Sequence, residues 1–162
     1  MNEEFFDELR EKAESYFERG GSHEFSHVMR VYNLAIIISK GEKVDLDIIR
    51  ASALLHDIAR EKEDNGEINC HAEEGSKIAE KILREVDFPR EKINSVVHSI
   101  EVHRHSKGLR AETREAEILQ DADRLDAADF EEPHLAALRN NGQYRSWDEL
   151  ISRLEKRLSD FK

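Results

Sequence analysis

One apolar stretch with an ionisable pair near its end constrains this chain more than any other feature. It runs from Asp47 to Arg60, D-I-I-R-A-S-A-L-L-H-D-I-A-R, and its interior is apolar on nearly every side. A helix that is apolar all round normally lies at the centre of a fold, covered by neighbours on several faces. The stretch nevertheless carries His56 and Asp57, and burying such a pair costs several kcal/mol, on the order of 5, unless something compensates it. Two interpretations stay open at this point: a bound divalent cation, or a buried His–Asp hydrogen bond between helices.

The composition predicts an all-α protein with one domain. A chain of 162 residues can bury a substantial core, and only two prolines and seven glycines interrupt it. We therefore expect a single-domain helical bundle of about six to eight helices. The domain spans residues 1–162, with a core at about 22–130 and further helices at 131–162.

Cysteine content, hydropathy and charge limit the cellular compartment and the kinds of binding partner that we expect. The one cysteine, Cys70, excludes an internal disulfide, no apolar run reaches the length of a membrane span, and the N-terminus is acidic. We therefore expect a cytoplasmic protein without a membrane segment. The net charge of −11 argues against a broad nucleic-acid surface but is compatible with a small anionic ligand, since a metal ion can dominate its local field.

Hydrophobic periodicity and capping residues place the helices. Asp45 or one of its neighbours is expected to begin the central helix, and Asn69 is expected to cap the helix that follows it. The connector at 60–69 is charged and is predicted to be a surface loop that could act as a lid. The predicted helices span about 3–18, 24–39, 45–60, 69–86, 90–103, 113–128, 134–139 and 146–160.

Several of these helices direct a histidine or an aspartate toward the interior. His27 shares a helical stripe with apolar residues, as does His71; His103 lies at the edge of an apolar face, and Asp121 falls between Ile118 and Leu125. A single such residue is usually a hydrogen-bonded core group. Six together favour a metal site, with four imidazole nitrogens and two carboxylates for one ion or a close pair that Asp57 bridges. The six are His27, His56, Asp57, His71, His103 and Asp121.

The order His27, His56-Asp57, Asp121 resembles the signature of the HD-domain superfamily of metal-dependent phosphohydrolases. The flanking segments S-H-V-M-R-V at 26–31, A-L-L-H-D-I-A-R at 53–60 and L-Q-D-A-D-R-L-D-A at 119–127 support this resemblance, and the last of them resembles a group of small prokaryotic HD hydrolases. The resemblance covers roughly residues 22–130. It implies an HD-like helical fold, although members of that group are often longer at the C-terminus.

The resemblance also implies roles for individual residues. The metal ligands of the family correspond to His27, His56, Asp57 and Asp121, and His71 and His103 correspond to ligands of a second ion. The implied cofactor is one or two divalent ions, with Mn, Fe, Co, Ni, Zn and Mg all open. Catalytic roles are expected for Asp57, Asp121, His71 and His103, of which the last three could also manage protons.

Side chains one helical turn from the ligands are candidates for binding substrate. Arg30 and Arg60 each face roughly the same way as a ligand histidine and could bind a phosphate, or could instead pair with a nearby carboxylate. Arg124 and Asp126 could orient the metal ligands. The roles of His98 and Glu61 stay open.

The leading functional hypothesis is hydrolysis of a phosphate ester or anhydride bond in a small, nucleotide-like substrate by metal-activated water. Whether the enzyme is a phosphomonoesterase or a phosphodiesterase stays open. Two alternatives remain: an HD-fold di-iron oxygenase, which uses a similar ligand set, and a non-catalytic sensor that binds a nucleotide or a metal. A homodimer is also open, because the apolar N-terminal helix could pack internally or against a second subunit.

Overall fold

The computed structural model of the chain describes residues 1–17, 22–104 and 107–128. Within these ranges the chain forms seven α-helices and no strand, which confirms the all-α prediction. The helices are α1 (Glu3–Glu14), α2 (Ser22–Ser39), α3 (Leu46–Leu55), α4 (Arg60–Asp64), α5 (His71–Glu85), α6 (Arg90–Val102) and α7 (Arg114–Ala128). The helices predicted at 134–139 and 146–160 lie outside the described residues.

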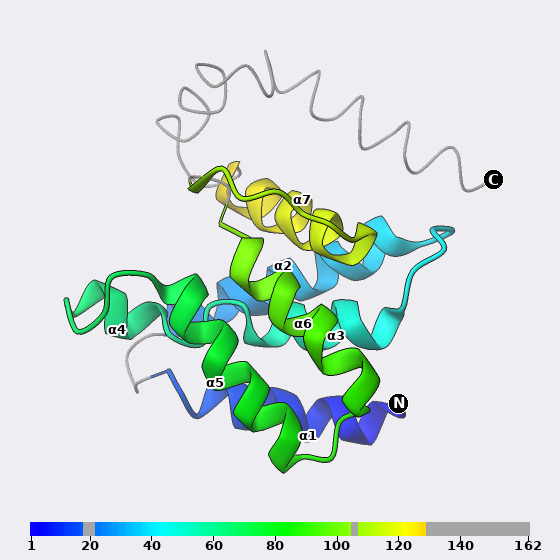
Figure 1. Cartoon of the computed structure of the whole chain (residues 1–162), viewed down its shortest axis with the longest axis horizontal. Helices are drawn as coiled ribbons and strands as arrows, with labels where there is room; N and C mark the ends of the chain where they lie inside the picture. Colours follow the sequence, from blue (N-terminus) through cyan, green and yellow to red (C-terminus); the bar gives the residue numbers. More distant parts are fainter. Residues whose placement is uncertain (18–21, 105–106, 129–162) are drawn as a thin grey trace.

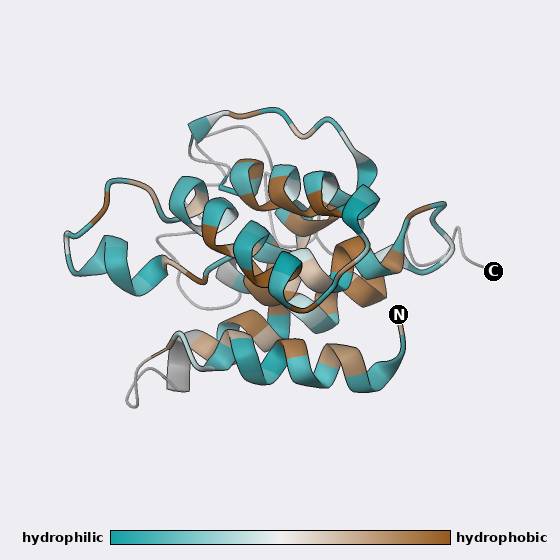
Figure 2. Ribbon diagram, turned by 60° about the horizontal axis from the view of Figure 1, so that its bottom comes forward, coloured by the Kyte–Doolittle hydropathy of each residue, from teal (hydrophilic) through white to brown (hydrophobic). Residues whose placement is uncertain are grey.

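Helix α3 lies at the centre of the bundle, as its uniformly apolar sequence predicts (Figure 1). It packs against α1, α2, α6 and α7. Its Leu54 and Leu55 belong to a core group shared with α1, α5 and α6, whereas its Ile49 and Ala53 belong to a second group shared with α2 and α7. Figure 2 shows the resulting distribution, with apolar residues on the inner sides of the helices and polar residues outside. Helix α3 therefore joins the two halves of the core.

The end of α3 differs from the prediction and shapes the site. The sequence predicts one helix through Arg60, but α3 ends at Leu55 and residues 56–59 form turns. The amide of Ile58 donates to Leu55 O at 3.3 Å, and the amide of Arg60 donates to Asp57 O at 2.9 Å. These three-residue hydrogen bonds wind the chain more tightly than an α-helix does. The local change of geometry occurs at His56-Asp57 itself.

The connector at 60–69 is not wholly a loop, because Arg60–Asp64 forms the short helix α4. Cys70, and not the predicted Asn69, occupies the N-cap position of α5 and provides no side-chain cap. The carboxylate of Glu63 instead accepts the hydrogen bond from the His71 amide at 2.5 Å. A contact between α4 and α5 thus supplies the acceptor that a local capping residue normally provides.

The other helix boundaries follow local sequence signals. Asn2 caps α1, and Asp45 caps α3 by accepting from the Asp47 amide at 2.9 Å, as predicted for Asp45. Gly41, with φ of +77°, lies just beyond α2, where the left-handed conformation favours glycine. In the described part of the chain, no helix has both the length and the apolar character needed to cross a membrane.

Candidate metal centre

Four histidines from separate segments bring their Nε2 atoms together in the interior. The Nε2 atoms of His27 and His56 are 3.3 Å apart, and those of His71 and His103 are also 3.3 Å apart. The rings of His56 and His103 connect the two pairs, with their centroids 5.2 Å apart. His56, His71 and His103 are almost fully buried, and His27 is partly buried. The structure thus brings together all four of the histidines that the sequence proposes as ligands.

The opposite ring nitrogen of each histidine contacts a hydrogen-bond acceptor. Nδ1 of His56 is 2.8 Å from Ala53 O, and Nδ1 of His103 is 2.6 Å from Ile100 O. A carbonyl oxygen can only accept, so each Nδ1 carries a proton and donates it. His27 and His71 place Nδ1 at 2.6 Å from Asp126 Oδ2 and at 2.7 Å from Glu63 Oε2, respectively. In the neutral rings, all four Nε2 lone pairs are therefore free to face the centre of the cluster.

Asp57 lies between the two histidine pairs and divides its oxygens between them. Oδ2 is 3.6 Å from Nε2 of His27 and 3.8 Å from Nε2 of His56. Oδ1 is 3.2 Å from Nε2 of His71 and 3.6 Å from Nε2 of His103. Asp57 could therefore provide one oxygen to each of two groups of donors.

The aspartate that α7 adds to the cluster is Asp123 and not the predicted Asp121. Oδ1 of Asp123 is 3.2 Å from Nε2 of His27 and 3.8 Å from Nε2 of His56. Two positions along a helix correspond to a rotation of about 200°, so Asp121 projects from a different side of α7. The buried residues Ala116 and Leu119, seven and four positions before Asp123, mark the inward face that it shares.

The distances within the cluster suit divalent metal ions. Metal–nitrogen bonds of about 2.1 Å place neighbouring ligand atoms about 3.0–3.4 Å apart in octahedral or tetrahedral sites. The separations here are 3.2–3.8 Å within each group. Two groups can be formed: His27, His56 and Asp57, to which Asp123 adds a fourth donor, and His71, His103 and Asp57. Lone pairs that converge in this way repel each other unless protons or cations lie among them.

Two opposing effects set the pKa values within the cluster: burial disfavours the charged form of each group, and neighbouring groups of opposite charge favour it. Burial disfavours protonated His27, but hydrogen bonds and charge from Asp123, together with Asp57 and Asp126, raise its pKa to about 9. Burial lowers the pKa of His56. Burial alone would raise the pKa of Asp57, but the surrounding histidines, His56 foremost, hold that pKa well below its ordinary value. Both Asp57 and Asp123 are therefore carboxylates at neutral pH, as metal ligands must be.

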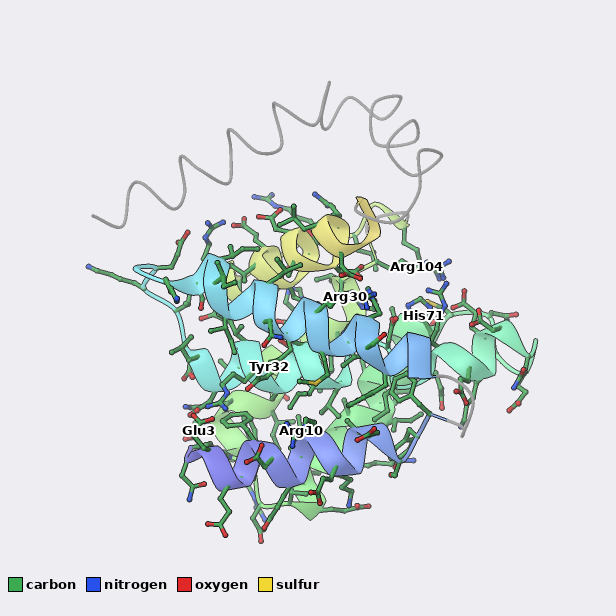
Figure 3. The ribbon with its side chains drawn as sticks, turned by 180° about the vertical axis from the view of Figure 1, so that it is seen from behind. Glu3, Arg10, Arg30, Tyr32, His71 and Arg104 are labelled. Carbon is green, nitrogen blue, oxygen red and sulfur yellow. The ribbon has the colours of Figure 1, made fainter. Side chains whose placement is uncertain are left out.

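Two of the histidines are held by parallel chains of charged side chains. Arg30 binds Asp126 through Nε at 2.6 Å and Nη2 at 3.0 Å, and Asp126 accepts from His27. Arg104 binds Glu63 at 2.7 Å, and Glu63 accepts from His71. In Figure 3, Arg104 and His71 lie close together near the start of α5, and Arg30 lies between α2 and α7. Asp126 thus has the orienting contact that the sequence suggests.

The sequence gives no signal for Glu63 and Arg104. Glu63 lies in the charged connector that is predicted as a surface loop, and no helical periodicity relates it to His71. Its burial would raise its pKa, but hydrogen bonds from His71 and Arg104 lower that pKa to about 2. Glu63 is therefore an anion at neutral pH, in contact with a histidine of the cluster.

The remaining candidates take varied positions. Arg60 lies 3.3 Å from Asp64, and the nearby Asp57 carboxylate contributes to raising its pKa against the effect of burial. His98 accepts a hydrogen bond from the Glu112 amide at 3.0 Å, away from the cluster. Among the described residues, the Nε of Arg124 is buried without a hydrogen-bond partner, so that atom orients none of the ligands.

Comparison with known proteins decides the family. The HD domain family model matches residues 25–128, which include every residue of the cluster. The chain belongs to the HD-domain family. A crystal structure described as a predicted HD superfamily hydrolase, from an uncultured Thermotogales bacterium, has 29% sequence identity and a TM-score of 0.69. The match covers 94% of this chain and 84% of that chain.

No curated protein matches the chain. The HD-domain assignment confirms the family resemblance and the HD-like helical fold that the sequence predicts. The matched range includes His56 and Asp57, which lie at the turn that ends α3. Family membership and the donor set together support a hydrolase-family site that could hold divalent metal, with the identity of the ion open.

Proposed function

We propose that this HD-domain protein is a metal-dependent phosphohydrolase that acts on a small, nucleotide-like phosphate ester or anhydride. The observation that carries the proposal is the orientation of the four histidine rings. Each contacts an acceptor through Nδ1, so each ring that holds no proton on Nε2 directs an Nε2 lone pair toward the shared Asp57 carboxylate. His27, with a pKa of about 9, would release its Nε2 proton when a metal ion binds. A core built only for hydrogen bonding would not place so many acceptor atoms against one another.

The protein side chains have separate roles in this proposal. His27, His56, Asp57 and Asp123 would hold one ion, and His71, His103 and Asp57 a second. A bound divalent ion supplies hydroxide at neutral pH by lowering the pKa of its water, and it polarises the phosphoryl oxygen. Asp123 is the more exposed of the two carboxylates, with 26% of its side chain accessible against 12% for Asp57. Asp123 is therefore the carboxylate better placed to exchange protons with solvent or substrate.

Arg60 is the side chain best placed to bind the substrate phosphate. It follows the His56–Ala59 turn, and about two fifths of its side chain is exposed, at 41%. Its partner Asp64 is itself exposed, so exchanging this weak ion pair for a phosphate costs little. Arg30 is more firmly committed because it binds Asp126 through two nitrogens. We assign Arg30 primarily to orienting Asp126, and we keep phosphate binding by Arg30 as a secondary role.

The proposal is tested by measuring metal-dependent phosphate release from a panel of nucleotides and phosphoesters. We expect turnover with added Mn²⁺, Co²⁺ or another divalent ion, and loss of that turnover in the double variant His56→Ala, Asp57→Ala. Glu91→Gln, an exposed substitution on the first turn of α6, is the matched control for loss of one charge. Full activity of the double variant would rule out this site as the source.

The same samples separate the alternatives. Substrate-dependent oxygen uptake by iron-loaded protein would favour the di-iron oxygenase. Tight nucleotide binding without product for any metal would favour the sensor.

A further inference from the structure

The two groups of candidate ligands differ in how completely the protein provides them. The first group offers four side chains, because Asp123 joins His27, His56 and Asp57. Among the residues that the structure describes, the second group offers three, which are His71, His103 and Asp57. An ion in the second group receives fewer protein donors and only one carboxylate. Its occupancy therefore depends more strongly on how well each remaining ligand is oriented.

Glu63 is the side chain that orients the second group. Its Oε2 accepts from both the backbone amide and Nδ1 of His71, at 2.5 and 2.7 Å. Arg104 donates to both oxygens of the same carboxylate, at 2.7 and 3.1 Å. Glu63 is thereby joined to α5 and to the segment just after α6, and only 19% of its side chain is exposed. The carboxylate fixes the His71 ring and makes its Nε2 a better electron-pair donor.

We propose that Glu63 is a positioning residue that sets the affinity of the second ion without setting that of the first. This inference rests on the proposed metal centre. The first ion is instead supported by Asp126, which accepts from Nδ1 of His27 and is held by Arg30. The two carboxylates lie at equivalent positions in separate halves of the cluster, and they provide a reciprocal pair of variants.

Helix α4 has a role in this proposal, because it holds Glu63 against His71. Helix α4 projects beyond the main bundle next to the start of α5 (Figure 1), yet it carries the carboxylate that reaches the metal cluster. Displacement of α4 would withdraw Glu63 from His71. The second ion would then lose its oriented ligand, whereas the contacts of His27 with Asp123 and Asp126 would remain.

The experiment titrates the full-length, metal-free protein with Mn²⁺ alone, by calorimetry, and follows Co²⁺ loading by visible absorption. Wild type is compared with Glu63→Gln, which keeps the shape of the side chain and removes its charge. Asp126→Asn is the reciprocal variant. Glu67→Gln, an exposed neutralisation in the same connector, is the matched control. Far-ultraviolet circular dichroism in the presence of EDTA establishes that each variant is folded.

We expect wild type to bind two ions with unequal affinity. Glu63→Gln should weaken the second binding step by about 10–100-fold, the usual effect of losing a partner of a ligand histidine, and change the first step by less than about 3-fold. Asp126→Asn should mainly weaken the first step, and Glu67→Gln should resemble wild type. Arg104→Met, which keeps Glu63 but frees it, should cause a smaller loss in the same second step and serves if Glu63→Gln does not fold.

Equal weakening of both steps by Glu63→Gln, or no weakening of either, would overturn the role of Glu63 and leave the metal centre intact. Binding of a single ion by wild type would do the same. Failure of wild type to bind any Mn²⁺ or Co²⁺ would overturn the metal centre and the role of Glu63 together.

Discussion

At the scale of single residues, the identity of the aspartate on α7 is a question of helical register. Ile118 and Leu125 are spaced so that Asp121 between them looks inward, yet Asp123 is the residue 3.2 Å from His27. Each residue rotates the helix by about 100°, so the two aspartates cannot serve the same cluster. We therefore expect neutralisation of Asp123 to affect metal binding and neutralisation of Asp121 to leave it nearly unchanged.

We predict that Asp123→Asn lowers metal affinity and catalytic activity by about 10-fold or more, because it removes a charged donor from the first group. Asp121→Asn removes the same charge two positions earlier and should change either quantity by less than about 3-fold. Calorimetric metal titration and phosphate-release assays on both variants provide the measurement. The opposite ranking would restore Asp121 as the ligand.

The raised pKa of His27 makes the stability of the metal-free protein depend on pH. His27 has a pKa of about 9 in the metal-free protein, compared with an ordinary value of 6.5. A raised pKa stabilises the folded state at low pH, and this contribution is lost as pH rises from about 6.5 to about 9. In EDTA, the stability difference between wild type and His27→Gln should therefore shrink across this window. Thermal unfolding at half-unit pH steps measures it, and a difference that is constant or grows with pH would contradict the assignment.

Some residues of the cluster can be predicted from the sequence and others cannot. The histidines stand out in the sequence because His27 and His71 share helical stripes with apolar residues, His103 lies at the edge of an apolar face, and His56 lies in a stretch that is apolar on nearly every side. Asp123 is harder, because the α7 segment contains three aspartates, at 121, 123 and 126, and its inward face is only settled by packing. Glu63 is not predictable, since its contact with His71 joins two helices across a turn whose path the sequence does not specify.

At the scale of elements, the turn at 56–59 depends on how closely α5 approaches it. A Cβ placed on Gly75 would lie 3.6 Å from His56 O and 3.6 Å from Ile58 Cγ2, which is ordinary van der Waals contact. There is room for a methyl group and for little more. The sequence suggests only that Gly75 leaves space one turn from His71, and the structure shows that the turn carrying His56 fills this space.

We predict that Gly75→Ala raises the free energy of unfolding by up to about 1 kcal/mol, because alanine restricts the unfolded chain and favours helix. Gly75→Leu, by contrast, should push α5 away from the turn, destabilise the fold by about 1–3 kcal/mol and weaken metal binding. Urea unfolding and metal titration of the two variants test this. Normal metal affinity in Gly75→Leu would show that the contact does not position the site.

The boundaries of α3 and α4 illustrate why elements are only partly predictable. The apolar pattern continues through Ala59, so periodicity alone extends the helix to Arg60. The hydrogen bonds from Ile58 to Leu55 and from Arg60 to Asp57 instead tighten the chain. This geometry lets the adjacent His56 and Asp57 both contact the cluster, which is a tertiary requirement that no local pattern encodes.

At the scale of the whole molecule, the cluster joins parts of the chain that the core packs separately. Its residues come from α2, the turn after α3, the start of α5, the end of α6, and α7. Helix α3, which ends at the turn that carries His56 and Asp57, contributes residues to both core groups. Ions bound there would cross-link most of the described helices.

We therefore predict that metal binding stabilises the whole fold. An ion at a concentration 1,000 times its Kd adds about 4 kcal/mol to the free energy of unfolding, provided that it binds only the folded state. Removal with EDTA should lower the Tm by several degrees, and readdition of metal should restore it. The double variant His56→Ala, Asp57→Ala is the control and should not respond. Identical melting curves with and without metal would contradict the prediction that metal binding stabilises the folded protein.

In the proposed metal centre, residues from five segments share divalent ions, and anomalous diffraction locates each ion among its ligands. Crystals grown with Mn²⁺ should show two anomalous peaks, one among His27, His56, Asp57 and Asp123, and one among His71, His103 and Asp57. Crystals of metal-loaded protein without a peak at either position would show that these residues do not hold the ions.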